Sequence, residues 1–430
     1  MNELKTIIAF LLFFTIYGCE KDLPIQTGAD ELYTLSLYST RNNREVTLKW
    51  ENPICEYCKD SYYTLLEPQY FEILMSTVDP SELEPYEDLS NNIFGATIGN
   101  LVNGKPYYFS VIAVGRNGKY VISNTIMTIP DDPENIQPLF QTIDENSELG
   151  TWSPDGSSVA YMGDYTWDNG YYSDKSVFIS ILSTNEKWLI EKSSYSPEWS
   201  PTGQKITYHT DNGEVNTSQG YRPTHIAVYN TQDSTIKRLT SGNSFNFRPT
   251  WSPDGNWIAF LSDQAGGNEY NIWKIPADSG TVIQVTTDFN DLTDFLNMTE
   301  RSPQKPSWSK DKEYIAFARL KRTSKGYDFD IYSVPSTGGN KTTVIYSQWD
   351  DYCPAYSPDG STIAFISNRS GLNEIWTMDL QTKKLKQITG SSKQWINGDW
   401  GKIEWSPSGD KILFTSYFDQ FFTLFTVDIN

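Results

Sequence analysis

The sequence predicts an all-β protein in which a small β-sandwich precedes a six-bladed β-propeller. Three observations predict this fold. The chain of 430 residues has room for two or three domains and is rich in Tyr and Trp, which favour strands. Short alternating runs of apolar and polar residues fill residues 31–130, without a helix-period segment of useful length. An aromatic-Ser motif then recurs six times with a period near 50 residues, which is typical of propeller blades.

The repeated motif has the residues of a tight turn. Most copies read aromatic-Ser-Pro-Asp-Gly, in which Pro sets φ, Asp bonds to backbone two residues on, and Gly accepts positive φ. An apolar strand follows each copy, for example Ile258-Ala259-Phe260. In the fourth copy Lys310 and Lys312 replace Pro and Gly, so we expect a looser turn there. The six copies begin at Trp152, Trp199, Trp251, Trp308, Tyr356 and Trp405.

The two ends of the array predict that it closes on itself. The sixth repeat ends after Phe425-Thr426-Val427 and lacks a final strand. Leu139-Phe140-Gln141-Thr142, just before the first repeat, matches the missing strand. We therefore expect residues 137–142 to complete the last blade, because such closure removes an exposed sheet edge.

These repeats resemble the propeller of the Tol-system (TolB-like) periplasmic proteins of bacteria. The resemblance covers residues 137–430 through the Trp-Ser-Pro-Asp-Gly turns and the strands that follow them. It implies the fold more strongly than the function, because this propeller is reused widely. The family has a small α/β domain before its propeller, whereas this chain has a β-rich segment there.

The segment at residues 31–130 resembles a fibronectin type III domain. Glu45 to Trp50 is a clear strand with a core Trp50, and residues 101–113 resemble the tyrosine corner and the strand after it. The resemblance implies that Tyr107 bonds back to backbone near Leu101. An insertion from Ile54 to Pro68 departs from the compact family loop and is either a contact surface or decoration.

The first 19 residues resemble a bacterial lipoprotein signal. Thr6 to Tyr17 is an apolar run too short to span a bilayer, and it ends at Gly18-Cys19, as in a lipobox. We expect lipidation of Cys19, with an ordinary secretory signal as the alternative. Residues 20–30 then form a flexible tether. The predicted location is the cell envelope, as an outer membrane lipoprotein that is periplasmic or surface-exposed.

Three further cysteines leave several possibilities open. Cys55 and Cys58 form a C-x2-C pair, for which an exported protein favours a disulfide over two thiols or a metal. A zinc site needs four ligands, and no second Cys or His pair lies nearby. Cys353 has no obvious partner and is expected to pack as a small apolar residue.

The charge of the chain argues against nucleic acid. Asp and Glu outnumber Lys and Arg by 54 to 34, for a formal charge of -20. Binding to phosphates requires clustered bases, and the sequence has no such cluster.

Candidate binding residues lie on the propeller side that receives the longer loops. Loops held by a rigid scaffold commonly carry binding residues, and exposed aromatic rings are common anchors. The alternative is that these rings cover the ends of the blades. The principal candidates are Trp167, Tyr172, Trp349 and Trp400.

Arg248, Lys305 and Lys402 stand at one position of the repeat, three residues before the aromatic. We expect them near the loop-side mouth of the central channel, where they could hold a carboxylate or an acidic peptide. Ion pairs with Glu198 and Glu404 are the alternative.

Two weaker patterns could bind metal. His209 and His225 flank one loop and, with Asp211 and Glu214, could form a metal site. A calcium site is possible but lacks the Gly and closing Glu of a calcium loop. Its candidate ligands are Asp288, Asp291 and Asp294. No catalytic constellation is found and no cofactor is expected.

The predicted function is binding rather than catalysis. The first hypothesis is an envelope scaffold that grips a protein or peptide through the loop side of the propeller. The alternative is a propeller that binds a glycan or processes polysaccharide with a metal.

Overall fold

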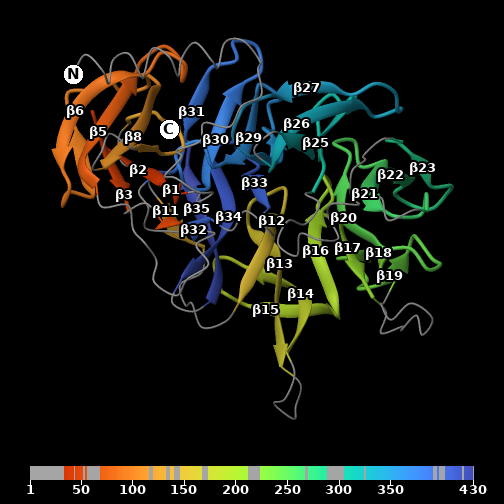
Figure 1. Ribbon diagram of the computed structural model, residues 1–430. Coiled ribbons are helices and arrows are strands. Elements are labelled where there is room, and N and C mark those ends of the chain that lie inside the picture. The colour runs from red at the N-terminus through yellow and green to blue at the C-terminus, as the bar shows by residue number, and fades with distance from the viewer. Residues whose placement is uncertain are drawn as a thin grey trace. The chain divides into compact units, whose positions relative to one another are not determined.

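The computed structural model is built from strands. It describes residues 33–42, 44–51, 54–55, 68–115, 120–131, 136–139, 146–166, 173–211, 223–266, 270–287, 305–323, 326–390, 395–396, 402–418 and 421–429. Within these ranges no helix has the length and hydrophobicity needed to cross a membrane. The chain divides into two compact units (Figure 1). Unit 1 comprises residues 1–133, 368–374 and 390–392, and unit 2 comprises residues 134–367, 375–389 and 393–430.

Unit 1 contains two principal antiparallel sheets. The smaller sheet has the order β2 (Leu37–Asn42), β3 (Glu45–Trp50) and β7 (Gly95–Ile98). The larger has the order β10 (Ile126–Thr128), β8 (Tyr107–Gly115), β5 (Pro68–Ser76) and β6 (Glu84–Ser90), with β9 (Tyr120–Ile122) also paired to β8. A short pair is formed by β1 (Tyr33–Thr34) and β4 (Ile54–Cys55).

The alternation of apolar residues explains how these sheets share one core. The expected strand at Glu45–Trp50 is β3, and its buried Trp50 ring lies 5.6 Å from the Phe71 ring of β5. Residues of both sheets belong to the same hydrophobic cluster. The expected contact of Tyr107 is also present, because the Val102 N–H donates to the Tyr107 hydroxyl at 3.0 Å.

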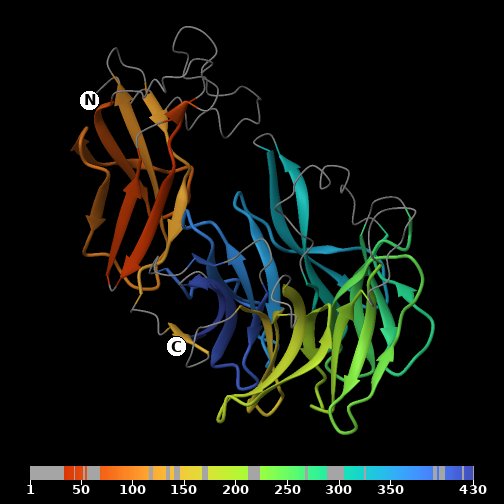
Figure 2. The ribbon, with the colours of Figure 1, turned by 90° about the horizontal axis from the view of Figure 1, so that it is seen from below.

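The described part of unit 2 forms six antiparallel sheets, numbered here in chain order. Figures 1 and 2 show them arranged around a common centre. Sheets 1 to 3 contain β12 (Ser147–Trp152), β13 (Ser158–Thr166), β14 (Ser173–Ile181) and β15 (Lys187–Lys192); β16 (Ser194–Trp199), β17 (Lys205–Thr210), β18 (His225–Asn230) and β19 (Ile236–Arg238); and β20 (Asn246–Trp251), β21 (Trp257–Ser262), β22 (Asn271–Pro276) and β23 (Ile283–Gln284).

The remaining sheets follow the same strand order. Sheets 4 and 5 contain β24 (Ser307–Trp308), β25 (Tyr314–Thr323), β26 (Gly326–Pro335) and β27 (Thr342–Ile345); and β28 (Asp351–Tyr356), β29 (Thr362–Ser367), β30 (Glu374–Asp379) and β31 (Leu385–Gln387). Sheet 6 contains β32 (Trp395–Ile396), β33 (Ile403–Trp405), β34 (Lys411–Phe418), β35 (Phe421–Asp428) and β11 (Ile136–Pro138).

Strand β11 comes from upstream of the repeats, as the sequence predicts. Ile136 pairs with Val427 of β35, and the Leu139 N–H donates to the Leu424 carbonyl at 2.8 Å. The rest of the expected segment, residues 140–142, lies outside the described residues. The array is therefore joined end to end within one sheet.

Apolar clusters between neighbouring sheets hold the array together. One combines Val177 and Ile179 of sheet 1 with Ile206 and Tyr208 of sheet 2. Another joins the first and last sheets through Val159 and Leu424. Each fully buried aliphatic side chain contributes about 1.5–3 kcal/mol. The apolar residues that follow each turn, such as Ile258-Ala259-Phe260, are buried as the sequence predicts.

The fourth turn is as tight as the third, so the expectation of a looser turn is wrong. Lys312 adopts φ 61°, close to the φ 71° of Gly255 at the same position. Its N–H donates to the Ser309 carbonyl at 2.8 Å, the bond that Gly255 makes with Ser252 at 2.9 Å. The Lys312 ammonium also pairs with Asp254 of the preceding turn at 2.8 Å. Lysine therefore retains the turn and adds a link between two turns.

Candidate functional site

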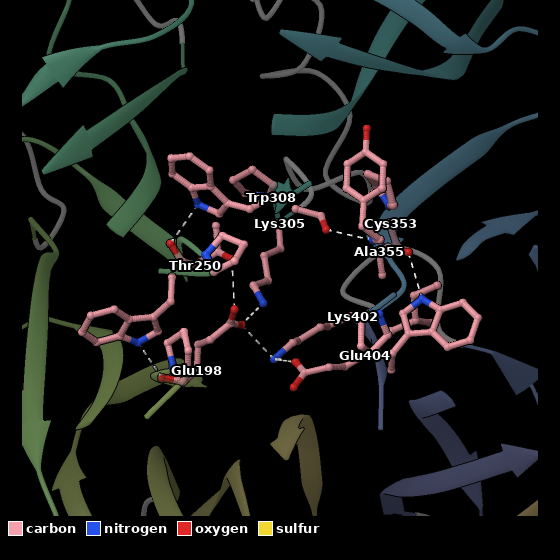
Figure 3. Close-up of a pocket in the computed structure, with 18 residues that line it drawn as sticks. Glu198, Thr250, Lys305, Trp308, Cys353, Ala355, Lys402 and Glu404 are labelled. Atoms are coloured by element: carbon pink, nitrogen blue, oxygen red, sulfur yellow. Dashed lines mark hydrogen bonds and ion pairs between the residues drawn. The ribbon is translucent and has the colours of Figure 1, made fainter. Parts of the chain in front are cut away.

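A cavity of about 310 Å³ lies at the centre of unit 2. We call it the central cavity. It is lined by residues of the first strands of sheets 2 to 6, and by Pro201, Pro253 and Pro358 of the turns (Figure 3). Since these prolines belong to the Ser-Pro turns, the cavity extends along the inner strands toward the turn side.

A repeated β-bulge shapes the inner strands that line this cavity. In four sheets the strand register shifts just before the aromatic residue of the motif. The first bulge residue is left-handed in each, with φ 52° at Leu149, 51° at Ser196, 52° at Arg248 and 52° at Cys353. A bulge re-aims the side chain that it carries. Lys305 and Lys402 occupy the corresponding sequence position in sheets 4 and 6 and line the cavity together with Cys353.

Two lysines and two glutamates meet in the cavity (Figure 3). Glu198 of sheet 2 contacts the ammonium of Lys305 and, at 3.3 Å, that of Lys402. Lys402 also contacts Glu404 of its own sheet. The two ion pairs of Glu198 connect alternate sheets, whose described strands do not pair with one another.

Each carboxylate is fixed by a hydroxyl from the next sheet. The Thr250 hydroxyl donates to Glu198 Oε1 at 2.9 Å. The Thr151 hydroxyl donates to Glu404 Oε1 at 2.7 Å, and the Trp152 N–H donates to the same oxygen at 3.1 Å. The second oxygen of each carboxylate is therefore the one that faces the lysines.

Burial perturbs the charges of this cluster. Desolvation, reinforced by the Lys402 ammonium, lowers the pKa of Lys305 well below its usual range. For Glu404, burial alone would raise the pKa, but Lys402 and Lys305 outweigh it and the pKa is lowered. Glu404 is thus held ionised, whereas the charge of Lys305 depends on the anions around it.

A second cluster lies where sheets 2 and 3 meet their longer loops. The Tyr195 ring stacks on His209 at 5.2 Å. Phe247 contacts His209 edge-on at 6.2 Å and Tyr270 at 4.9 Å. Burial and the Arg248 guanidinium lower the pKa of His209 to about 3, so this imidazole is neutral. We call Tyr195, His209, Phe247 and Tyr270 the aromatic cluster.

Comparison with protein families identifies the propeller. The family model "TolB beta propeller domain" matches residues 122–304 and 294–430, well over half of the chain. The chain belongs to the TolB β-propeller family. The resemblance predicted from the turn motifs is therefore confirmed for the fold.

Curated relatives of this TolB-type chain have differing names. An uncharacterized protein of Agrobacterium fabrum, Atu1656, is 28% identical over 54% of this chain and 68% of its own length. Dipeptidyl-peptidase 5 of Porphyromonas gingivalis is 24% identical over 71% of this chain and 49% of its own length. A TolB homolog of Chlorobium luteolum is 24% identical over 42% of this chain and 37% of its own length. The chain spans about half the length of the second relative and little more than a third of the third.

Solved structures with this type of fold are similarly varied. TolB from Acinetobacter baumannii aligns with a TM-score of 0.42 and 14% identity, over 76% of this chain and 77% of that structure. An oligogalacturonate lyase in complex with manganese aligns with a TM-score of 0.47 and 12% identity, over 94% and 99%. The family assignment rests on the family model.

The three predicted bases of this TolB-type propeller do not lie at one site. Lys305 and Lys402 line the central cavity and form the ion pairs that were the alternative interpretation. Arg248 is buried near His209, and burial lowers its pKa. The cavity that the two lysines line extends from them along the inner strands to the turn prolines.

The predicted histidine pair cannot share a metal ion. In the register of β17 and β18, Thr210 pairs with His225 and His209 pairs with Ile226. Neighbouring residues of a strand point to opposite faces, so the two imidazoles lie on opposite sides of the sheet. This corrects the candidate metal site; Glu214 lies outside the described residues.

Of the other residues singled out in the sequence, the structure describes only some. Trp349 is half-buried in the loop between β27 and β28, whose Tyr346 is 74% exposed. Cys353 packs in an apolar cluster, as expected. For Cys55 the structure describes only the backbone, in β4. The remaining candidates lie outside the described residues, namely Cys19, Cys58, Trp167, Tyr172, Asp288, Asp291, Asp294 and Trp400.

The sequence contains a signal for the bulge that the repeat motif alone does not reveal. Pro197, Pro249, Pro306 and Pro354 each stand two residues before the aromatic of their repeat. Because proline has no N–H to donate to a ladder, it is confined within sheets to edges and bulges. Pro197, Pro249 and Pro354 lie within the register shifts of sheets 2, 3 and 5.

Proposed function

We propose that this protein is a lipid-anchored scaffold of the cell envelope that binds a protein or peptide partner through the loop side of its propeller. The loop side is the side that receives the connections between second and third strands and between consecutive sheets. The observation that supports this most is the presence of aromatic rings there, in the aromatic cluster and at the exposed Tyr346 of the loop between β27 and β28. Exposed aromatic residues on a rigid scaffold are frequent anchors of interfaces.

The remaining domain assignments belong to the same proposal. Lipidated Cys19 and the tether at residues 20–30 would anchor the protein, and an oxidised Cys55–Cys58 pair would suit an exported chain. The buried Trp50 and the Tyr107 bond support a fibronectin type III-like module at residues 31–130. The six sheets and strand β11 support six blades. The family also includes proteins named Tol-Pal system protein TolB, which supports an envelope partner.

One loop-side variant with a matched control tests this function. Full-length tagged protein is cross-linked in membranes and purified, as wild type, Tyr346→Ser and Tyr314→Ser. Tyr314 is also exposed, at 44%, but begins β25 directly after a turn. Because loss of an interface anchor costs about 2 kcal/mol or more, Tyr346→Ser should reduce partner recovery roughly tenfold or more, with Tyr314→Ser unchanged. Equal recovery with all three proteins would overturn the proposal.

A glycan is the second candidate ligand, and the aromatic cluster favours it. Flat ring faces such as that of Tyr195 suit the apolar faces of sugar rings as well as protein side chains. Screening the full-length protein against polysaccharides distinguishes the two ligands. Saturable glycan binding that Phe247→Ala abolishes, without recovery of any protein, would favour the glycan. Metal-dependent processing loses its support, since His209 and His225 face opposite ways.

A further inference from the structure

The central cavity already holds one carboxylate between two ammonium groups. Glu198 enters from sheet 2 and contacts Lys305 of sheet 4 and Lys402 of sheet 6. Its other oxygen is held by Thr250. The cavity thus contains a site whose geometry suits a carboxylate, and a side chain of the protein occupies that site.

The cavity also has space and walls for an apolar group. Its volume of about 310 Å³ is at the lower end of the range for small-molecule sites, which are mostly apolar with a few polar groups. Indoles of Trp251, Trp308 and Trp405 line it, and each indole N–H donates to a backbone carbonyl of the preceding sheet. These rings are therefore held in place, and the space suits a small molecule rather than a folded partner.

The polar groups of the cavity include donors that a carboxylate could use in place of Glu198. Burial and Lys402 together lower the pKa of Lys305, so a further negative charge nearby would stabilise its protonated form. Ser307 Oγ, which also lines the cavity, accepts the Tyr356 N–H at 3.0 Å, so its own O–H can donate to an incoming ligand. Two ammonium groups and a hydroxyl therefore lie in the same cavity as the three tryptophan residues.

We propose that the central cavity binds a small organic carboxylate with an apolar body, held by Lys305 and Lys402, and that Glu198 is the internal counter-ion that this ligand displaces. The apolar body lies against the indoles. The site is distinct from the loop-side surface proposed above, so either proposal can fail without the other.

Benzoate is a suitable probe because it combines a carboxylate with a flat apolar body. It is titrated calorimetrically into the full-length protein at neutral pH. Wild type should bind benzoate, and Glu198→Gln should bind it about tenfold more tightly because the internal competitor loses its charge. Lys305→Met should bind at least tenfold more weakly. Lys312→Met, which changes an exposed turn lysine, should match wild type.

Benzylamine serves as the matched probe of opposite charge and should not bind. Absence of benzoate binding to both wild type and Glu198→Gln overturns the proposal, as does equal affinity of these two proteins. Equal binding by Lys305→Met and wild type would place the anion elsewhere and would also overturn it. If Lys305→Met fails to fold, the benzoate affinities of wild type and Glu198→Gln still decide the proposal. Lys305→Arg, which keeps the positive charge, then replaces Lys305→Met and should still bind benzoate.

Discussion

Two rings of residues differ in what the repeat keeps constant. One ring is made of the Ser-Pro-Asp-Gly turns, and the other of the residues three positions before each repeat aromatic. In the turns the side chains recur: Ser252 donates to Asp254 at 2.6 Å, and Ser357 donates to Asp359 at 2.5 Å. At the position three residues before each aromatic, which carries a left-handed bulge residue in sheets 1, 2, 3 and 5, the side chains differ from sheet to sheet. These six positions hold Leu149, Ser196, Arg248, Lys305, Cys353 and Lys402.

This difference means that the turn residues are fixed by the fold, whereas the inner-strand residues can vary in their chemistry. A turn side chain must satisfy its own backbone, so its identity is restricted by local hydrogen bonding. A bulge positions its side chain through the backbone, which leaves the residue type open. The turns are mostly exposed, whereas the bulge residues are mostly buried. The loss of stability caused by a substitution should therefore be larger at the buried positions than in the turns.

The largest effect is expected at Lys402, the buried lysine at the equivalent position of sheet 6. Lys402→Met leaves Glu404 without its nearest cation and Glu198 with one cation fewer. Breaking a buried ion pair by removing one partner typically costs about 3–5 kcal/mol. Urea denaturation should show a loss of this size, partly recovered in the double variant Lys402→Met, Glu404→Gln. A single variant as stable as wild type would contradict the importance of these ion pairs for the array.

A smaller effect is expected at a turn aspartate. The Ser357 hydroxyl donates to Asp359 at 2.5 Å and the Ser361 N–H donates at 3.0 Å. Asp359→Ala removes these two bonds and the bond that the Ser361 hydroxyl donates at 2.7 Å, all at an exposed site, at a cost of about 1 kcal/mol. Thermal unfolding at neutral pH should detect this change. A cost near that of Lys402→Met would erase the contrast between the two rings.

The same aspartate gives an acid dependence of definite sign. Its hydrogen bonds, that of Ser357 first, lower the pKa of Asp359 from 3.8 to about 2 in the folded state. A lowered folded pKa means stability that is present above about pH 4 and is lost as the pH falls toward 2. The free energy of unfolding, measured by urea titration across this interval, should fall less steeply in Asp359→Ala than in wild type. Parallel pH profiles would refute this linkage.

The smallest effect is expected where the fourth turn departs from the repeat. Lys312→Gly relieves a left-handed residue at φ 61° but loses the partly exposed pair with Asp254. The two terms oppose each other, and both are small because the site is exposed to solvent. The melting temperature should therefore hardly change. A large loss would mean that the Lys312–Asp254 pair, rather than the turn geometry, stabilises this part of the propeller.

Much of the fold was predictable because its determinants are local. The Ser-Pro-Asp-Gly residues specify a turn wherever they occur, and the apolar triplets after them specify a buried strand. The closing strand was predictable because the last repeat lacks a strand, and Ile136–Pro138, just upstream of the first repeat, pairs with β35 there. The local rule failed at Lys312, where a lysine retains the turn and pairs with Asp254 of the neighbouring turn.

The chemistry of the central cavity depended on contacts that no local pattern contains. The sequence identified Lys305 and Lys402 as unusual bases and named Glu198 as a possible partner. It could not decide that side chains from sheets 2, 4 and 6 meet, because that requires the ring to close. Nor could it separate His209 from His225, since strand register decides the face on which each lies. The repeat by itself determined the blades, and only the closed tertiary structure decided which of their side chains share a cavity.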